Sequence, residues 1–496
     1  MSSTPENSLT LPSTPTPADL DALAASTRPL DPDARERARL MEAVFAYADG
    51  YLSTLPDQPA YFDRPDLGRA LRDLPIPEEG IGLEAALNLL REHVDTVGLN
   101  PTSGRFLGYI PGGGLFYAAL GDFLAAVTNR YAGVFFAGPG AVRIENRLIR
   151  WMADLAGYPE TAAGYLAAGG SLANLTALIT ARDDRQIEGA AVEHAVVYLT
   201  EHAHHCIDKA LRLAGLRRVV RRPIPVDDGF RMDVAALERA IAADRAAGLR
   251  PWLVVASAGT TNTGSVDPLD AIGAVAAAHD LWYHVDAAYG GFFALTPEGA
   301  ARLRGMERSD SLVMDPHKTL FLPYGTGALI VRDGRKLRAA HAADADYLQD
   351  TRLADEESSP ADLSPELTKH FRGLRLWLPL QVVGLAPFRA ALAEKLHLAR
   401  YFHARLQEVP GFEVGPPPDL SVVIYRYVPR RGDADAFNAR LADALRRDGR
   451  IFVSSTRLNG QFWLRLAAVG FRTHREDIDT ALEVLEATAR RLAERT

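Results

Sequence analysis

The stretch SLVMDPHKTLFLPYGTGALIVRD, residues 311–333, sets a lysine directly after a histidine at the end of a short apolar run. A Pro-Tyr-Gly-Thr-Gly turn and a second apolar run follow it. Short apolar runs bounded by turn residues are typical of buried strands. A lysine at the end of such a strand either reaches out to water or is held for chemistry. The surrounding sequence has to decide which of these applies to Lys318.

Strand-like and helical segments alternate through the middle of the chain. Besides residues 311–318, the runs rich in Val, Leu or aromatic residues are HAVVYLTEHAHH (194–205), PWLVVASAGTT (251–261), LWYHVDAAYGG (281–291) and GALIVRD (327–333). Between them, the segments with apolar residues at helical spacing are 207–216, 234–248 and 268–280. This alternation predicts an α/β fold with a mostly parallel sheet flanked by helices.

The pattern changes along the chain and predicts four segments. Residues 1–30 begin with a stretch rich in Ser, Thr and Pro and are predicted to be a disordered tail. Residues 31–100 have helical periodicity and are predicted to pack on another surface, such as a second subunit. Residues 101–386 hold the strand–helix alternation and form a large domain. Residues 387–496 change to long helices with a few strands, which predicts a smaller C-terminal α+β domain.

The composition is that of a globular protein, with 47% hydrophobic and 24% charged residues. The formal net charge of −8 argues against nucleic acid or an anionic membrane surface as a main partner. No apolar run is long enough to span a bilayer, and the N-terminus lacks a signal pattern. The single cysteine, Cys206, cannot form an intramolecular disulfide and fits a reducing compartment. We therefore expect a cytoplasmic protein.

Polar residues fall at the ends of the predicted strands, where an open α/β sheet binds its ligands. They are His204, Thr260, Asp286 and Lys318. One cofactor, pyridoxal 5′-phosphate (PLP), uses such a set. It needs a lysine amine to form an imine with its aldehyde. It also needs a carboxylate at its ring nitrogen, because a protonated pyridine is a better electron sink. Lys318 and Asp286 are the candidates for these two roles.

The segment AAGGSLANLTALITARDD (167–184) can supply an anion site for the cofactor's phosphate. Gly169 and Gly170 permit close approach of the backbone, and Ser171 is predicted to cap the following helix. The ring of His204 can stack on the cofactor face. Ala288, two residues after Asp286, is expected on the same strand face, where a flat ring can lie against its methyl group.

Other chemistries have weaker support in the sequence. The glycines of GGS form neither a GxGxxG motif nor a P-loop. A zinc site could be imagined from His202, His204 and His205, but no second ligand cluster accompanies them, and we predict no metal. Cys206 is expected to be a small buried side chain rather than a nucleophile.

Together these motifs resemble a known family. HVDAAYGG (284–291), followed by DPHKTLF (315–321), resembles the group II PLP-dependent amino-acid decarboxylases, which include aromatic amino-acid, glutamate and histidine decarboxylases. The likeness runs from about Glu42 to Leu485 and includes GYIPGGGLFYAALGDFLAAVTN, GPGAVRIENRLIRWMADLAGYP, HFRGLRLWLPLQ and FWLRLAAVG. The combination is specific, whereas any one motif is not. The resemblance implies the PLP-dependent transferase fold of type I and a homodimer with shared active sites, whose interface includes residues 31–100.

The resemblance also implies roles for individual residues. Lys318 matches the imine lysine, Asp286 the pyridinium partner and His204 the ring-stacking residue. The remaining cofactor-binding positions would be Gly170 and Ser171 at the phosphate, helped by His317, with Thr260 and Ala288 near the ring. Arg372, in HFRGLRLW, matches a family arginine whose role is either functional or purely structural.

The family comparison suggests which residues shape the substrate pocket. Tyr109 and Pro111 match the segment that faces the substrate. Tyr131 and Phe135 match positions that reach toward it, in relatives often across the dimer interface. These rings favour an aromatic substrate, although they can equally be ordinary interface core. An acidic substrate would need a pocket cation, for which Arg105 or Arg130 is conceivable.

One departure from the family pattern concerns the product. Relatives carry a tyrosine on a moving loop, which is thought to protonate the substrate carbon after CO2 leaves. Here residues 348–366 contain no tyrosine, and Tyr347, at the start of the loop, is the available candidate. The favoured function is decarboxylation of an L-amino acid, preferably aromatic, to the primary amine and CO2. The alternatives are an aldehyde synthase or another enzyme of this fold, and a catalytically silent PLP-binding protein.

Overall fold

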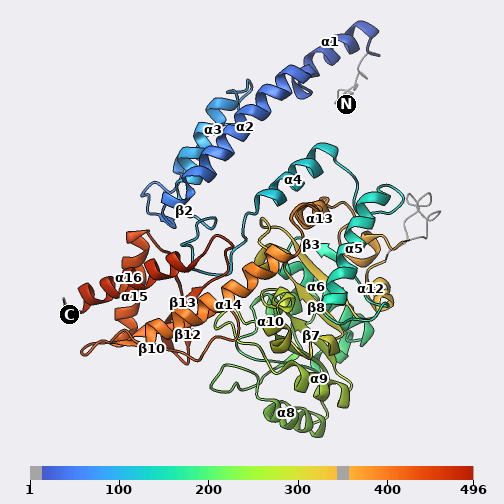
Figure 1. Cartoon of the computed structure of the whole chain (residues 1–496). Coiled ribbons are helices and arrows are strands. Elements are labelled where there is room, and N and C mark those ends of the chain that lie inside the picture. The colour runs from blue at the N-terminus through green and yellow to red at the C-terminus, as the bar shows by residue number, and fades with distance from the viewer. Residues whose placement is uncertain (1–13, 343–356, 495–496) are drawn as a thin grey trace, which may run out of the picture. The chain divides into compact units, whose positions relative to one another are not determined.

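The computed structural model describes residues 14–342 and 357–494 (Figure 1). The chain divides into two compact units. The first comprises Met1–Asp57 and Pro65–Val97, and the second comprises Gln58–Arg64 and Gly98–Thr496. The predicted site residues that the structure describes all belong to the second unit.

The first unit is helical, and one of its helices lies within the segment predicted to be a disordered tail. This helix, α1 (Pro17–Thr27), begins at Thr16, whose hydroxyl accepts the N–H of Asp19 while the Asp19 carboxylate accepts the N–H of Thr16. Such a capping box with proline in the first turn starts a helix even in a Ser/Thr/Pro-rich stretch. The other helical elements are α2 (Ala34–Thr54), α3 (Leu83–Leu90), the π-helical turn η4 (Arg91–Asp95) and the 3-10 turns η1 (Arg28–Leu30), η2 (Leu55–Asp57) and η3 (Arg69–Leu71).

The second unit is built on a seven-stranded sheet with the order β3-β9-β8-β7-β6-β4-β5. Its strands are β3 (Ala163–Ala167), β4 (Ala195–Leu199), β5 (Val220–Pro223), β6 (Arg250–Ser257), β7 (Trp282–Asp286), β8 (Ser311–Met314) and β9 (Gly327–Val331). β9 pairs antiparallel with both β3 and β8, and the remaining pairings in this sheet are parallel. The predicted mostly parallel α/β sheet is therefore confirmed.

The alternation of side chains along each strand divides the core into two layers. On β4, Val196 and Tyr198 belong to one buried cluster, and Val197 and Leu199 belong to the other. The first cluster includes residues of α5 (Pro139–Leu155), α8 (Val234–Ala246), α9 (Leu269–Ala278), α13 (Arg372–Val383) and α14 (Ala386–Gln407). The second includes residues of α6 (Gly170–Asp184), α7 (Cys206–Leu213) and α12 (Gly334–His341). Helices thus cover both faces of the sheet, which explains why its central strands are apolar along their whole length.

The predicted helical segments 207–216, 234–248 and 268–280 correspond to α7, α8 and α9. The other helices around the large sheet are α4 (Phe116–Thr128), α10 (Pro297–Arg302) and α11 (Pro316–Thr319), besides those of the two buried clusters. Within the described ranges no single helix has the length and apolarity of a membrane span. The pair α13 and α14, bent by 97°, reaches that length and composition together.

The C-terminal part of this unit has a smaller sheet and helices of its own (Figure 1, orange to red). Its antiparallel sheet has the order β10-β11-β13-β12, with β10 (Phe412–Val414), β11 (Val422–Tyr427), β12 (Ser454–Leu458) and β13 (Gln461–Ala467). The helices α15 (Ala434–Asp448) and α16 (Arg475–Ala493), together with α14, share a buried cluster with this sheet. A separate antiparallel pair joins β1 (Tyr61–Phe62) to β2 (Gly98–Leu99).

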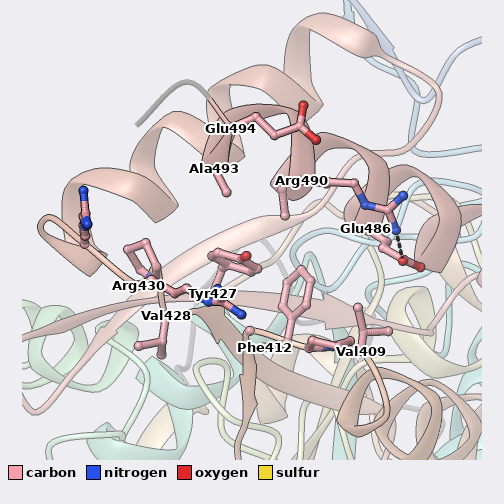
Figure 2. A pocket seen from close by; sticks show the side chains of 14 residues that line it. Val409, Phe412, Tyr427, Val428, Arg430, Glu486, Arg490, Ala493 and Glu494 are labelled. Carbon is pink, nitrogen blue, oxygen red and sulfur yellow. Dashed lines mark hydrogen bonds and ion pairs between the residues drawn. The ribbon is translucent and has the colours of Figure 1, made fainter.

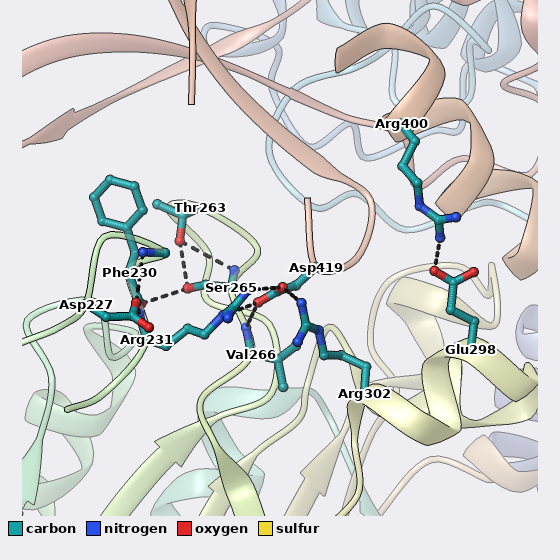
Figure 3. A network of polar contacts seen from close by, with 11 residues as sticks. Asp227, Phe230, Arg231, Thr263, Ser265, Val266, Glu298, Arg302, Arg400 and Asp419 are labelled. Atoms are coloured by element: carbon teal, nitrogen blue, oxygen red, sulfur yellow. Dashed lines mark hydrogen bonds and ion pairs between the residues drawn. The ribbon is translucent and has the colours of Figure 1, made fainter. Parts of the chain in front are cut away.

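A buried carboxylate ties the C-terminal sheet to the loops at the strand ends of the large sheet (Figure 3). Asp419, just before β11, has a side chain only 2% exposed. It accepts two hydrogen bonds from the guanidinium of Arg231, at 2.7 and 3.0 Å, and one from the N–H of Val266 at 2.9 Å. Arg302 of α10 pairs with the same carboxylate. Next to it, the hydroxyls of Ser421 and Tyr289 lie 2.6 Å apart.

We predict that Asp419→Asn lowers the free energy of unfolding by about 2–4 kcal/mol, because two arginines lose their shared counter-charge. Urea denaturation of the full-length protein measures this change. Glu298→Gln is the control, since the Glu298–Arg400 pair joins α10 to α14 at a half-exposed position. That substitution should cost less than about 1 kcal/mol. Equal losses in the two variants would contradict the assignment of Asp419 as the principal polar tie.

Candidate active site

A cavity of about 450 Å³ opens at the carboxyl ends of the central strands, where the sequence predicted the site. It brings together these predicted residues: Gly170, Ser171, His204, Thr260, Asp286, His317 and Lys318. They come from the beginning of α6, the loops after β4 and β6, the last residue of β7, and the short helix α11. The remaining lining residues include Asn174, Cys206, Ser257, Tyr289 and Asp315.

Lys318 lies on α11, beyond the end of β8, and its side chain is 23% exposed. Its Nζ is 3.0 Å from Oδ2 of Asp315, whose side chain is 1% exposed. Removal from water works toward a lower pKa of Lys318. The carboxylates of Asp315 and Asp286 outweigh this effect and raise the pKa. The structure therefore holds the lysine amine at the cavity wall rather than in bulk water.

Asp286 is the last residue of β7, and both of its carboxylate oxygens accept an N–H group. Oδ1 accepts the backbone N–H of Ala288 at 3.1 Å, and Oδ2 accepts an amide N–H of Asn174 at 3.3 Å. The assigned strand ends at Asp286, and Ala288 lies two residues beyond it in the same buried cluster as Trp282 of β7 and the residues of α6. Its methyl group is therefore on the α6 side of the sheet, as predicted, while its N–H donates to the Asp286 carboxylate.

Glycines make the space at the start of α6. A Cβ atom at Gly170 would lie 2.7 Å from Oδ2 of Asp315 and 3.3 Å from Cβ of Ala288. A Cβ at Gly327, on β9, would lie 2.6 Å from Oδ1 of Asp315. The helix begins at Gly170 with Gly169 as the N-cap, so the predicted capping role of Ser171 is wrong. Ser171 belongs to the first turn, where backbone N–H groups have no partner within the helix and can bind an anion.

Three further predicted residues complete the cavity wall. The Nδ1 atom of His204 accepts the N–H of Cys206 at 3.3 Å, and burial lowers the pKa of His204. His317 Nδ1 lies 2.6 Å from the carbonyl of Thr326, so this nitrogen carries the proton. The hydroxyl of Thr260 lies 2.7 Å from that of Thr263 and 3.1 Å from that of Ser265. Burial raises the pKa of the Cys206 thiol, as suits a small buried side chain.

The predicted substrate residues do not line this cavity within one chain. Tyr109 is 52% exposed, and its N–H donates to the hydroxyl of Ser454, whereas Pro111 is buried. The Tyr131 hydroxyl donates to the carbonyl of Leu367 at 3.1 Å. Phe135 is 5% exposed, and the guanidinium of Arg143 lies over its ring. Their roles toward a substrate stay predictions.

Two residues of the predicted loop region have different outcomes. Tyr347 lies outside the described residues, so its role as proton donor stays a prediction. Arg372, at the start of α13, binds the Glu366 carboxylate through two hydrogen bonds of 2.9 and 3.2 Å. It also donates to the carbonyl of Leu166 at 3.4 Å. These contacts join the start of α13 to β3.

Asn174 and Asp315 line the cavity, and neither was predicted from the sequence to belong to it. Asn174 lies on α6, on the helix face that meets the sheet, and is 1% exposed. A buried asparagine in an otherwise apolar helix face was the available signal. Asp315 sits in the quoted DPHK motif, and its position three residues before Lys318 was the signal there. Their place in the site is apparent only in the folded structure, where the strand ends lie next to one another.

The described residues also form a further large cavity, which lies away from the predicted site residues. This second cavity, of about 680 Å³, lies in the C-terminal part between β10, β11 and α16, and contains none of the predicted residues (Figure 2). In the part of the chain that the structure describes, no group of three or more His, Cys, Asp or Glu side chains could hold a metal ion. The first cavity is therefore the candidate active site.

The fold and the cavity define the class of protein: a PLP-dependent enzyme of fold type I. Among solved structures, Oryza sativa TDC crystallised with PLP and tryptamine superimposes with a TM-score of 0.87 at 28% identity, covering 93% of this chain and 99% of that chain. An aromatic-L-amino-acid decarboxylase of Bacillus atrophaeus is 33% identical over 84% of this chain and 87% of its own length. A phenylacetaldehyde synthase of Arabidopsis thaliana is 28% identical over 93% and 97%.

The pyridoxal-dependent decarboxylase conserved domain matches residues 70–428. This chain therefore belongs to the pyridoxal-dependent decarboxylases and is a PLP-dependent carboxy-lyase. The residues present fit that cofactor on their own geometry. The glycine-lined start of α6 leaves room for a phosphate, a lysine amine faces the cavity, and a carboxylate with N–H donors on both oxygens stands at its wall.

We predict that Gly170→Ala weakens PLP binding, because the new methyl group must displace the Asp315 carboxylate. Overpacking of this kind costs about 1–3 kcal/mol, which corresponds to roughly a 5- to 150-fold higher Kd. Titration of apoenzyme with PLP, followed by absorbance, measures it. Gly140→Ala is the matched control, since a Cβ at Gly140 in α5 meets nothing within 4 Å. An unchanged Kd in Gly170→Ala would show that the close contact does not matter for the cofactor.

Proposed function

We propose that this enzyme decarboxylates an aromatic L-amino acid to the primary amine and CO2. The observation that carries the proposal is the meeting of Lys318, Asp286 and His204 in one cavity beside the glycine-lined start of α6. The names of the relatives support the substrate class, because the Bacillus atrophaeus relative is an aromatic-L-amino-acid decarboxylase and the Oryza sativa structure holds tryptamine.

The chain's own residues have distinct tasks in this proposal. PLP, when bound, supplies an aldehyde carbon that bonds an amine and a pyridine ring that takes up the electron pair left when CO2 departs. Lys318 Nζ would bond that aldehyde carbon in the resting enzyme, and Asp315 Oδ2, 3.0 Å away, would hold a free Nζ as an ammonium. Asp286 would accept the hydrogen bond of the protonated ring nitrogen, and His204 would pack on the ring.

The backbone and the polar loops hold the remaining groups of the cofactor. The first N–H groups of α6, with Ser171 and His317, would bind the phosphate. Thr260 lines the cavity and would lie near the ring, and its hydroxyl is held by Thr263 and Ser265. Ala288 fixes Asp286 through its N–H. These residues would orient the cofactor.

We also propose that the active unit is a cytoplasmic homodimer that shares its active sites. An exposed apolar surface on α4 supports a partner of the same kind, since large apolar patches mark interaction sites. Its side chains are each 37–66% exposed: Phe116, Tyr117, Phe123, Leu124 and Val127. Tyr131 and Phe135 follow α4 directly, so a partner subunit could bring its own rings to the cavity and favour a flat substrate.

The direct test of the function uses Lys318→Ala. The wild-type holoenzyme should form a borohydride-reducible adduct on the peptide that contains Lys318 and release one amine per CO2 from an aromatic amino acid. The variant should form no adduct and lose turnover, because no other amine replaces Nζ. A reducible adduct in Lys318→Ala would contradict the lysine assignment. Preference for a glutamate-like substrate over aromatic ones would contradict the substrate class.

The last prediction of this function concerns the product. We propose that Tyr347 donates the proton that completes the amine, because residues 348–366 contain no tyrosine. Tyr347→Phe should slow amine formation by roughly 100- to 10,000-fold, as expected when a general acid is removed. CO2 release should continue, with O2 and water converting the decarboxylated substrate to aldehyde, ammonia and hydrogen peroxide. Amine, aldehyde and CO2 are measured in one assay, and wild-type amine formation in the variant would exclude Tyr347 as the acid.

A further inference from the structure

Strand β7 lines up three polar or partly polar side chains on one face of the sheet. Alternate residues of a strand share a face, so Trp282, His284 and Asp286 point the same way. Trp282 belongs to the core cluster on the α6 side of the sheet, and Asn174 of α6 contacts both His284 and Asp286. Ser311 of β8 is paired with His284 across the two strands. These residues therefore form one buried polar row under α6.

The row is a continuous chain of hydrogen bonds. The indole N–H of Trp282 lies 2.9 Å from the hydroxyl oxygen of Ser311. That oxygen lies 2.8 Å from Nδ1 of His284, and Nε2 of His284 lies 2.7 Å from Oδ1 of Asn174. The amide nitrogen of Asn174 then reaches Oδ2 of Asp286 at 3.3 Å. Four of these side chains are at most 1% exposed, so water cannot replace a missing partner; they are Trp282, Ser311, His284 and Asn174.

The direction of the bonds follows from the indole and from the need of a buried hydroxyl to donate its proton. An indole nitrogen can only donate, so the Ser311 oxygen accepts from Trp282. The buried Ser311 proton also needs an acceptor, and Nδ1 of His284 is the other side-chain partner of this hydroxyl among the described residues. His284 then carries its proton on Nε2 and donates it to Oδ1 of Asn174. This orientation of the amide turns its NH2 toward Asp286. The reverse orientation would set two unprotonated oxygens against each other and leave the Ser311 proton without an acceptor.

We propose that Trp282, Ser311, His284 and Asn174 are positioning residues that form a one-way hydrogen-bond chain and present Asp286 to the cavity purely as an acceptor. This inference deepens the proposed function and rests on it for the role of Asp286 at the cofactor ring. The chain cannot relay protons, because the indole N–H at its far end does not leave. It acts by fixing the tautomer of His284 and the orientation of one amide.

The surroundings of His284 keep its imidazole neutral, and so keep the direction of the hydrogen bonds the same, over a wide pH range. Burial lowers the pKa of His284 to about 4, against the opposing effect of the Asp286 charge. The charged and titratable groups that face the chain are Asp286 on β7 and Cys206 on α7, and Lys336 of α12 lies over the Trp282 ring. A neutral His284 leaves the direction of the bonds unchanged at every pH above that value.

The first test reads the tautomer directly by nitrogen NMR of histidine-labelled apoenzyme, with His284→Gln to assign the signals. We expect Nε2 protonated and Nδ1 bare, without change from about pH 6 to about pH 8. Trp282→Phe removes the obligate donor and should give a mixture of tautomers. Trp252→Phe is the matched control, because Trp252 is also a buried tryptophan of the same cluster but its Nε1 has no partner among the described residues. It should leave the His284 signals unchanged.

Ser311→Ala provides a second route if Trp282→Phe does not fold, since it cuts the same chain at its next member and should also release the tautomer. A wild-type His284 that carries its proton on Nδ1, or that is an imidazolium at neutral pH, would overturn the proposal. So would a wild-type tautomer that persists in both Trp282→Phe and Ser311→Ala.

The second test connects the chain to the cofactor. Asn174→Asp keeps the shape of the side chain but replaces the NH2 donor with an oxygen. PLP should then bind roughly 10- to 100-fold more weakly, as expected for loss of a hydrogen bond to a charged group. Its absorption band should titrate within the neutral range, whereas Trp252→Phe should keep wild-type values. Lys318 should still form the reducible adduct in Asn174→Asp. Loss of that adduct in the wild type would instead contradict the proposed function.

Discussion

A lysine amine that is largely removed from water needs counter-charges close by, and the candidate site is arranged around this requirement. Lys318 Nζ finds Asp315 Oδ2 at 3.0 Å, and the charge of Asp286 adds to the attraction. Two carboxylates near one amine need room and need hydrogen bonds of their own. The glycines at 170 and 327 provide the room, since a Cβ at either would strike Asp315. The glycines that make room for Asp315, the partner of Lys318, thus also keep the start of α6 open for a cofactor.

The carboxylate at the other side of the cavity depends on a different kind of support. Asp286 is held by the N–H of Ala288 and by a buried row of polar side chains that begins at Trp282. A buried polar row is costly unless every member is satisfied, and here each donor meets an acceptor when the bonds run in one direction. The C-terminal sheet adds a third support. It reaches the strand-end loops through Asp419 and through the hydroxyl pair of Ser421 and Tyr289. Parts far apart in the sequence thus fix a few side chains at one sheet edge.

The candidate site therefore depends on the side chains that hold its reactive groups in place as much as on the reactive groups themselves. The lysine, the aspartate and the histidine are common residues with ordinary chemistry in water. Their surroundings decide which nitrogen carries a proton, which oxygen accepts it and how close the cofactor can approach. Membership of the pyridoxal-dependent decarboxylases gives the reaction, whereas the rings predicted to face the substrate, Tyr131 and Phe135, do not line the cavity of a single chain.

The sequence by itself determined the α/β class and the central residues of the site. Apolar runs that alternate with helical periodicity can be recognised locally, and a polar residue after each run marks the carboxyl end of a strand. A local signal also misled at the start of α6. A glycine, not Ser171, occupies the N-cap of this helix, because the exact ends of elements depend on which backbone groups find partners in three dimensions. Only the tertiary structure revealed Asn174 and Asp315. Each is an ordinary residue in its own segment, and its importance comes from side chains that lie far away in the sequence and meet it only when the sheet and α6 pack together.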